Sequence, residues 1–204
     1  MYSTKTATTN NQEFNSSYMS VGINENVTLK EVNVKKTDNG RDFLEMVFEN
    51  QDGQTATMTE WKNEKNMWIK TDEDLQNRDN QQFGRILQVI DACLGEHEEF
   101  EGSSFVEMIK WVESKLNIVT GNLNTLLRLK VVYDKKGYTK VSSLGIFVEP
   151  MSVEQSQIKL WKNDLLERPV IADREDDPLV AAAHEAQLLN TPVTETTGAE
   201  DLPF

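Results

Sequence analysis

The chain has 204 residues and a formal net charge of −13, from 21 Lys and Arg against 34 Asp and Glu. A charge of this sign excludes a protein that binds nucleic acid through a uniformly positive surface. The 38% of hydrophobic residues, among them four Trp and eight Phe, are enough for one hydrophobic core. We therefore expect one domain with polar tails.

The small numbers of cysteine and histidine residues and the hydropathy of the chain exclude further classes of protein. One cysteine, Cys93, excludes an internal disulfide framework, and with only two histidines the chain lacks the nitrogen and sulfur ligands of a tetrahedral zinc site. No apolar run approaches the roughly 20 residues of a membrane span, and the first residues lack the apolar segment of a signal peptide. We therefore expect a cytoplasmic protein without a metal, a cofactor or a membrane partner.

Charge is distributed unevenly along the chain. Residues 173–204 contain eight acids and one base, a net charge of −7, whereas residues 125–148 contain five bases and one acid, a net charge of +4. The acidic segment is rich in Thr, Ala and Pro and buries too little apolar surface to fold alone. We predict a flexible N-terminal segment at residues 1–20, a folded domain at residues 21–168 and a disordered acidic tail at residues 169–204.

The first half of the folded domain is predicted to form three strands. The apolar phase changes midway through residues 21–36, which requires one extra residue near Lys30 and indicates a bulged, bent strand. Turn sequences then separate this strand from alternating segments at residues 43–49 and 54–61. The three strands are expected to form an antiparallel meander.

The second half combines helices and strands. Apolar residues at helical spacing predict helices at residues 80–94 and 104–117, and a lysine-rich turn joins predicted strands at residues 125–133 and 138–148. Three strands, helices and two strands are the order of a five-stranded OB-fold barrel with a helical connector between strands 3 and 4. We therefore predict this mainly β fold, with residues 152–168 as either a strand or a helix along the domain.

No catalytic signature is present. The sequence has no nucleophile elbow, no phosphate-binding glycine loop, no histidine metal spacing and no Cys and His pair typical of catalysis. Acidic runs at residues 72–74, 98–99 and 176–177 would form a two-metal nuclease site only on rigid strands, and they lie in predicted polar connectors. We expect these runs to be solvated, Cys93 to be a core residue, and the protein to have no enzymatic activity.

Aromatic and basic side chains alternate on the predicted strands. Single-stranded DNA is bound by aromatic rings that stack on bases and by cations along the phosphates, so this alternation is the chemistry that such a ligand needs. For Trp61, which follows a threonine-lined strand face, stacking and core packing are equal alternatives. The predicted DNA-binding residues, with the aromatic ones stacking and the cationic ones holding phosphates, are Arg41, Phe43, Trp61, Lys62, Arg128, Lys130, Lys135, Lys136, Tyr138 and Lys140.

The end of the chain is a second candidate site. An apolar end works against the solubility that an acidic tail provides, but it suits a peptide ligand. Such a ligand inserts its terminal Phe into an apolar pocket while basic groups of the partner bind the terminal carboxylate and the neighbouring acids. The predicted partner-binding residues are Glu200, Asp201, Leu202, Pro203 and Phe204.

Together these features resemble single-stranded DNA-binding proteins of bacteria and phages, whose tails end in an acidic run followed by Pro-Phe. The body is more similar to the OB-fold members from tailed bacteriophages than to the bacterial protein. The residues that carry the resemblance lie at 22–27, 59–61, 130–138, 147–151 and 200–204. The resemblance implies sequence-independent binding of single-stranded DNA in replication, recombination and repair, in the cytoplasm of a host cell, with the tail recruiting replication proteins.

Alternatives stay open beside this interpretation. The same barrel can serve as a protein-interaction adaptor of a replisome that does not bind nucleic acid, and a metal-dependent nuclease is a third alternative. If DNA is the ligand, the acidic tail is expected to compete with it for the basic strip, so that the free protein is partly self-masked. The sequence contains no recognisable heptad repeat or interface patch, so it does not determine the oligomeric state, and a homo-oligomer is one alternative.

Overall fold

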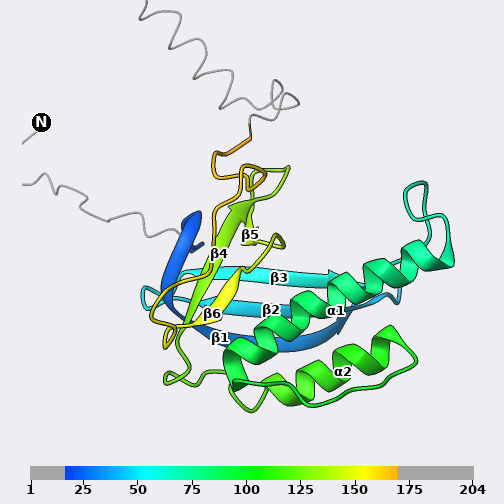
Figure 1. The fold of residues 1–204 in the computed structure, drawn as a ribbon, viewed down its shortest axis with the longest axis horizontal. Coiled ribbons are helices and arrows are strands. Elements are labelled where there is room, and N and C mark those ends of the chain that lie inside the picture. The colour runs from blue at the N-terminus through cyan, green and yellow to red at the C-terminus, as the bar shows by residue number, and fades with distance from the viewer. Residues whose placement is uncertain (1–16, 170–204) are drawn as a thin grey trace, which may run out of the picture. The chain divides into compact units, whose positions relative to one another are not determined.

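The computed structural model describes residues 17–169, and the predicted acidic tail with its Phe204 end and residues 1–16 lie outside this part. Six strands build the sheet of the described residues, and five of them follow one another around the barrel: β1 (Gly22–Lys36), β2 (Asp42–Glu49), β3 (Thr55–Trp61), β4 (Leu127–Tyr133) and β5 (Thr139–Val141). Their spatial order is β3-β2-β1-β4-β5, and β3 and β5 approach each other so that a barrel is nearly closed (Figure 1). This arrangement confirms the predicted OB-fold barrel.

The bend of β1 lets one strand join both halves of the barrel. Its pairing with β2 shifts register between Leu29 and Glu31, so Lys30 is the extra residue that the apolar pattern predicted. A second shift, between Asn24 and Val27, interrupts the pairing of β1 with β4. Inside the bend, alternate side chains of the strands point inward and fill the core, among them Leu29, Leu44, Met46, Phe48 and Met58.

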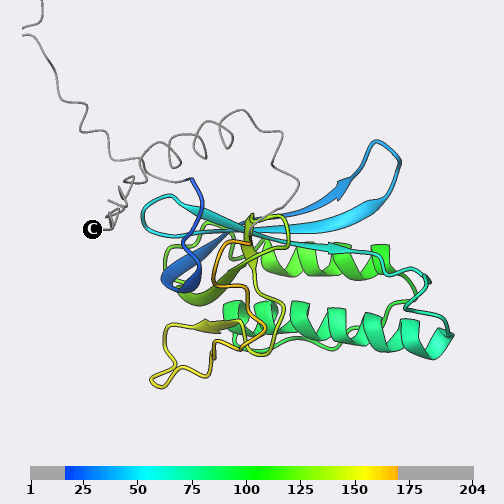
Figure 2. The ribbon, with the colours of Figure 1, turned by 90° about the horizontal axis from the view of Figure 1, so that it is seen from above.

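Two helices, α1 (Asp72–Leu94) and α2 (Phe105–Leu116), connect β3 to β4 and lie on the same side of the sheet (Figure 2). α1 begins at Asp72 rather than at residue 80, because Thr71 and Asp74 form a capping box. The Asp74 amide donates to Oγ1 of Thr71 at 3.0 Å, and the Thr71 amide donates to the Asp74 carboxylate at 3.1 Å. These hydrogen bonds from Thr71 lower the pKa of Asp74. The acidic run at residues 72–74 is therefore the first turn of a helix and not a connector.

The predicted strand at residues 138–148 is instead two short strands, β5 and β6 (Val148–Pro150), that both pair with β4. β5 pairs with the end of β4 and β6 with its beginning. Ser142 and Phe147 both form hydrogen bonds with the Lys130 backbone, so residues 143–146 are the ones that leave the sheet. The Leu144 carbonyl in this excursion accepts a hydrogen bond from the Lys130 side chain at 2.8 Å.

Residues 152–168, here called the strap, form neither a helix nor a strand. The strap covers the outer face of β4, where it buries Ile158 and Asp164 and where the Tyr133 amide donates to the Leu165 carbonyl at 2.8 Å. Both faces of β4 are therefore covered. The predicted alternation of a core face and a solvated face holds for β2 and β3 but is wrong for β4.

Candidate nucleic-acid interface

An aromatic pair lies at one end of β3. Phe43 and Trp61 are partners in the β2–β3 register, and their rings stack with centroids 4.3 Å apart at an interplanar angle of 24°. The guanidinium carbon of Arg41 lies 5.9 Å from the centre of the Trp61 ring, in cation-π range. Trp61 is 39% exposed. It is thus a surface residue, and of the two alternatives for it core packing is wrong.

The outer face of β3 beyond Trp61 is a row of threonines. Thr55, Thr57 and Thr59 alternate with inward-facing residues and are half-buried or exposed. Beside them on β2, Glu45 and Glu49 form ion pairs with Lys35 and Lys30 of β1, so their negative charge is balanced locally. This face therefore offers a row of small hydroxyl side chains beside two carboxylates of β2, Glu45 and Glu49, that are both paired with lysines.

The β4–β5 turn carries the predicted lysines at the other end of β3. Asp134 shapes the turn, because its Oδ1 accepts from the amides of Lys136 at 2.8 Å and Tyr138 at 2.9 Å. Lys135, Lys136 and Lys140 are exposed and form no ion pair within residues 17–169. The turn thus presents three cations to solvent without carboxylate partners in the described part of the chain.

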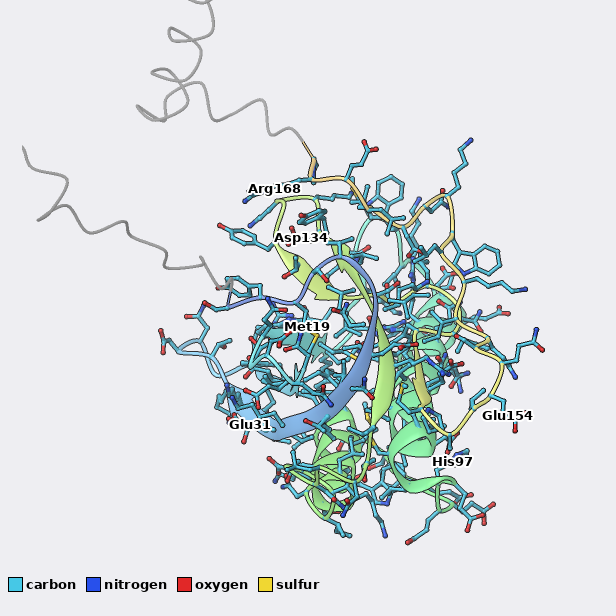
Figure 3. All side chains as sticks on the ribbon, turned by 90° about the vertical axis from the view of Figure 1, so that its left-hand side faces the viewer. Met19, Glu31, His97, Asp134, Glu154 and Arg168 are labelled. Atoms are coloured by element: carbon cyan, nitrogen blue, oxygen red, sulfur yellow. The ribbon has the colours of Figure 1, made fainter. Side chains whose placement is uncertain are left out.

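Tyr138, 60% exposed, lines a cavity of about 390 Å³ together with Tyr18, Tyr133 and Arg168. Figure 3 shows Asp134, at the start of the turn, and Arg168 at the same end of the barrel. The sequence did not point to Tyr18 or Arg168 as residues of this cavity. Tyr18 lies in the segment that composition assigned to a flexible tail, and Arg168 gave no signal because its position depends on the path of the strap.

Lys130 is not a surface residue, and the expectation that it holds phosphate is wrong. Its side chain is 0% exposed and forms an ion pair with Asp164, Nζ to Oδ2, at 3.0 Å. Its Nζ also donates to the carbonyls of Leu144 at 2.8 Å and Lys159 at 3.0 Å. The three ammonium hydrogens are therefore all engaged inside the protein.

Arg128 is also unsuited to bind phosphate, because its side chain is only 14% exposed and lies between two carboxylates. Its guanidinium contacts Glu149 and Glu25, each at 3.1 Å, and donates to the Val153 carbonyl at 2.8 Å. The hydrogen bond to Glu149, followed by that to Glu25, raises the pKa of Arg128. Like Lys130, it fastens the covered face of β4, which corrects its predicted role.

The remaining predicted residues gather in two clusters. The Trp61 cluster contains Arg41, Phe43, Trp61 and the exposed Lys62, and the hairpin cluster contains Lys135, Lys136, Tyr138 and Lys140. The row from Thr55 to Trp61 joins them, because Gln54 lines the tyrosine cavity and Thr57 and Thr59 line a cavity with Lys140. At about 3.3 Å per residue the row is about 20 Å long.

Other chemistries find little support in the described part of the chain. Residues 17–169 contain no group of three His, Cys, Asp or Glu side chains placed to hold a metal ion. Cys93 lies in the core, as predicted, and burial raises its pKa to about 12, which suppresses its reactive thiolate form. None of the helices described here is both long and apolar enough to cross a membrane.

Compared with protein-family models and with the curated proteins, the sequence matches none.

Proposed function

We propose that this OB-fold protein binds single-stranded DNA, without sequence preference, along the outer face of β3. One observation supports this proposal most strongly. An exposed aromatic side chain lies at each end of the threonine row, Trp61 at one end and Tyr138 at the other. Lys62 follows Trp61, and Lys135, Lys136 and Lys140 lie around Tyr138; none of these four forms an ion pair within the described residues, whereas Arg41 pairs with Glu64 at 3.6 Å. Stacking groups and available cations therefore occur together at both ends.

The energetics of this surface suit a flexible polyanion. Stacking of a base on an aromatic ring contributes about 1–3 kcal/mol and tolerates every base, and cations beside the rings hold the phosphates. The threonines between the clusters let the strand approach the sheet closely. A duplex keeps its bases stacked inside, so it cannot use the aromatic rings, and we expect it to bind more weakly. One barrel of this kind covers about 4–16 nucleotides.

The cellular role that follows from such binding is the protection of single-stranded DNA in replication, recombination and repair. Residues 200–204 would recruit replication proteins through the apolar and acidic end of the chain. The alternative remains an adaptor that binds a protein through the same barrel and does not bind nucleic acid.

Titration of a labelled oligothymidine, followed by fluorescence anisotropy, tests the proposal. Trp61→Ala should weaken binding about 5- to 150-fold, the range for the loss of one stacked base. Trp68→Ala is the matched control, because Trp68 is 83% exposed and lies outside the threonine row. If the unmodified protein does not bind the oligonucleotide, the adaptor is favoured. If it binds and Trp61→Ala binds equally well, DNA does not use this face.

A further inference from the structure

Another cavity lies next to the β3–β5 seam, which is the gap between these two strands where the barrel is not fully closed. It has a volume of about 1010 Å³ and is bounded by α1, by residues 143–146 and by the strap. Four glutamines line it, together with Lys159 and Trp161, and no carboxylate does: the glutamines are Gln81, Gln88, Gln155 and Gln157. In a chain with a net charge of −13, a groove of this size without an acid in its lining suits an anionic ligand.

This α1–strap groove is continuous with the threonine row. A cavity of about 460 Å³ lies in the seam. It is lined by Thr57 and Thr59 of β3 and by Lys140 of β5, and also by two carboxylates, those of Glu60, which is paired with Arg85, and Asp134. Arg85 and Ser143 line both the seam cavity and the α1–strap groove. The two cavities are therefore neighbours, and a strand that leaves the outer face of β3 beside Lys140 is next to the groove.

Trp161 is held in place as a half-exposed ring. Its amide donates to Oδ2 of Asp164 at 2.7 Å, and the Asp164 amide donates to the Trp161 carbonyl at 2.9 Å, while 52% of the residue stays exposed. The indole packs against Gly145, where a Cβ would lie 2.8 Å from Nε1 of Trp161. Gly145 also has φ +64°, a conformation that disfavours other residues. The ring thus lies against the backbone of Gly145 at the wall of the groove.

Lys130 fixes the two walls of the groove to each other. It donates to the Leu144 carbonyl on one wall and to the Lys159 carbonyl on the other, and its ion pair with Asp164 holds the turn that carries Trp161. These contacts are buried, so water competes for them poorly. The groove is therefore formed before any ligand arrives, which lowers the entropic cost of binding.

We propose that the α1–strap groove is a second nucleobase-binding site, which takes the continuation of the single strand bound on β3; this inference rests on the proposed function. Trp161 stacks on a base and Lys159, which forms no ion pair within residues 17–169, contacts a phosphate. Arg85 contributes little charge, because its guanidinium contacts both carboxylate oxygens of Glu60, at 3.2 and 3.0 Å.

The glutamines favour a nucleobase over an acidic peptide as the ligand. Each amide offers a donor and an acceptor, as the edges of bases do, whereas carboxylates only accept hydrogen bonds. Gln88 donates to the Gly145 carbonyl at 3.4 Å, and its buried Oε1 has no hydrogen-bond partner among the described residues. Turned toward the groove, this oxygen can accept from an N–H group of a base, such as N3–H of thymine.

Oligothymidines of graded length, from about 4 to about 16 nucleotides, test the inference when titrated against the full chain. Trp161→Ala should bind the short ones as the unmodified protein does and the long ones about 5- to 150-fold more weakly. Trp61→Ala should weaken binding at every length, and Trp68→Ala at none. Lys159→Gln should lower the salt slope by about 0.7 for long oligothymidines only. Trp161 is half-exposed, so its truncation leaves the core intact.

The outcomes separate the two proposals. If Trp161→Ala matches the unmodified protein at all lengths while Trp61→Ala loses affinity, the second site is wrong and the first stands. If the unmodified protein binds no oligothymidine, the proposed function is wrong and the inference falls with it. An oligoglutamate peptide is the probe for the other ligand class. If it binds the unmodified protein and not Trp161→Ala, and DNA affinity does not depend on Trp161, the groove takes acidic peptides and the inference is overturned.

Discussion

Lys130 and Asp164 form an ion pair in which neither side chain reaches the surface, with Nζ 3.0 Å from Oδ2. The pair joins a barrel strand to the strap. Ser142 also donates to the Asp164 carboxylate, at 3.1 Å, so three segments of the chain meet at one carboxylate. A buried charge that loses its partner destabilises a protein far more than an exposed one does.

A double-mutant cycle measures this coupling. Lys130→Met leaves the Asp164 carboxylate buried without its cation, and Asp164→Asn leaves the ammonium without its anion, so each should lower the free energy of unfolding by about 3–5 kcal/mol. The double variant should lose less than the sum of the two by at least about 1 kcal/mol. Urea unfolding followed by circular dichroism gives the three values. Simple additivity would show that the two side chains do not stabilise each other.

Acid should weaken the attachment of the strap. Burial by itself raises the pKa of Asp164, but hydrogen bonds from the Trp161 amide, Lys130 and Ser142 outweigh it, and the net pKa is lowered. The unfolded chain, with an Asp pKa of about 3.9, therefore takes up a proton first on acidification. The stabilisation is fully present above that value and is lost as the pH falls through the lower folded pKa.

Urea unfolding between pH 7 and pH 3 checks this expectation. The free energy of unfolding should fall less steeply below about pH 4 in Asp164→Asn than in the unmodified protein, since one linked carboxylate is missing. Glu154→Gln is the control, because Glu154 lies exposed on the strap. Equal slopes in the unmodified protein and Asp164→Asn would contradict the prediction.

The salt dependence of DNA binding should locate the phosphate-binding cations. Replacing Lys135 and Lys136 together by Gln should reduce the slope of log affinity against log salt by about 1.4, that is about 0.7 for each phosphate that the variant no longer neutralises. Lys110→Gln, at an exposed position of α2, should leave the slope unchanged. Arg128→Gln should lower stability instead, because Arg128 lies between Glu25 and Glu149. An unchanged slope in the Lys135 and Lys136 variant would place the phosphates elsewhere.

Removal of residues 173–204 should raise the affinity for single-stranded DNA. This segment carries a net charge of −7, and we expect it to compete with DNA for the same cations. The gain should shrink at high salt, because screening weakens the competition. The same deletion should abolish recruitment of partner proteins, measured by pull-down with replication proteins. An affinity that stays level or falls would contradict self-masking.

The β1–β2–β3 meander and the β4–β5 turn can be predicted from the sequence, because turn residues and a period of two are local signals. The pairing of β1 with β4 is not a local signal, and it is expected only from the element order of the OB-fold. The bulge at Lys30 and the surface position of Phe43 follow from the same signals. The start of α1 cannot be predicted from these signals, because its first turns carry few apolar residues and only the cap at Thr71 indicates it. Helical periodicity predicts only the part of a helix that has a row of apolar residues on one face. A helix can extend beyond that row when a capping box stabilises its first turn.

The error at Lys130 has a different cause. Alternation assigns a side chain to one face of a strand, but it cannot show whether a distant segment covers that face. The strap that covers β4 has no regular structure, so no periodic pattern announces it. The role of Trp161 depends on the same segment and is equally out of reach. Both the burial of Lys130 and the position of Trp161 depend on contacts between residues far apart in the chain, and local sequence patterns do not indicate such contacts.

The open seam between β3 and β5 has a consequence for the backbone. The Thr55 amide points away from β2, since it donates to the Ser17 carbonyl at 2.9 Å. By the alternation of a strand, the amides of Thr57 and Thr59 point the same way, toward the seam, where no described strand pairs with them. They should exchange hydrogen for deuterium much faster than the amides of β1, which has partners on both sides. Slower exchange at these two threonines would then report a ligand in the seam residue by residue, without any substitution.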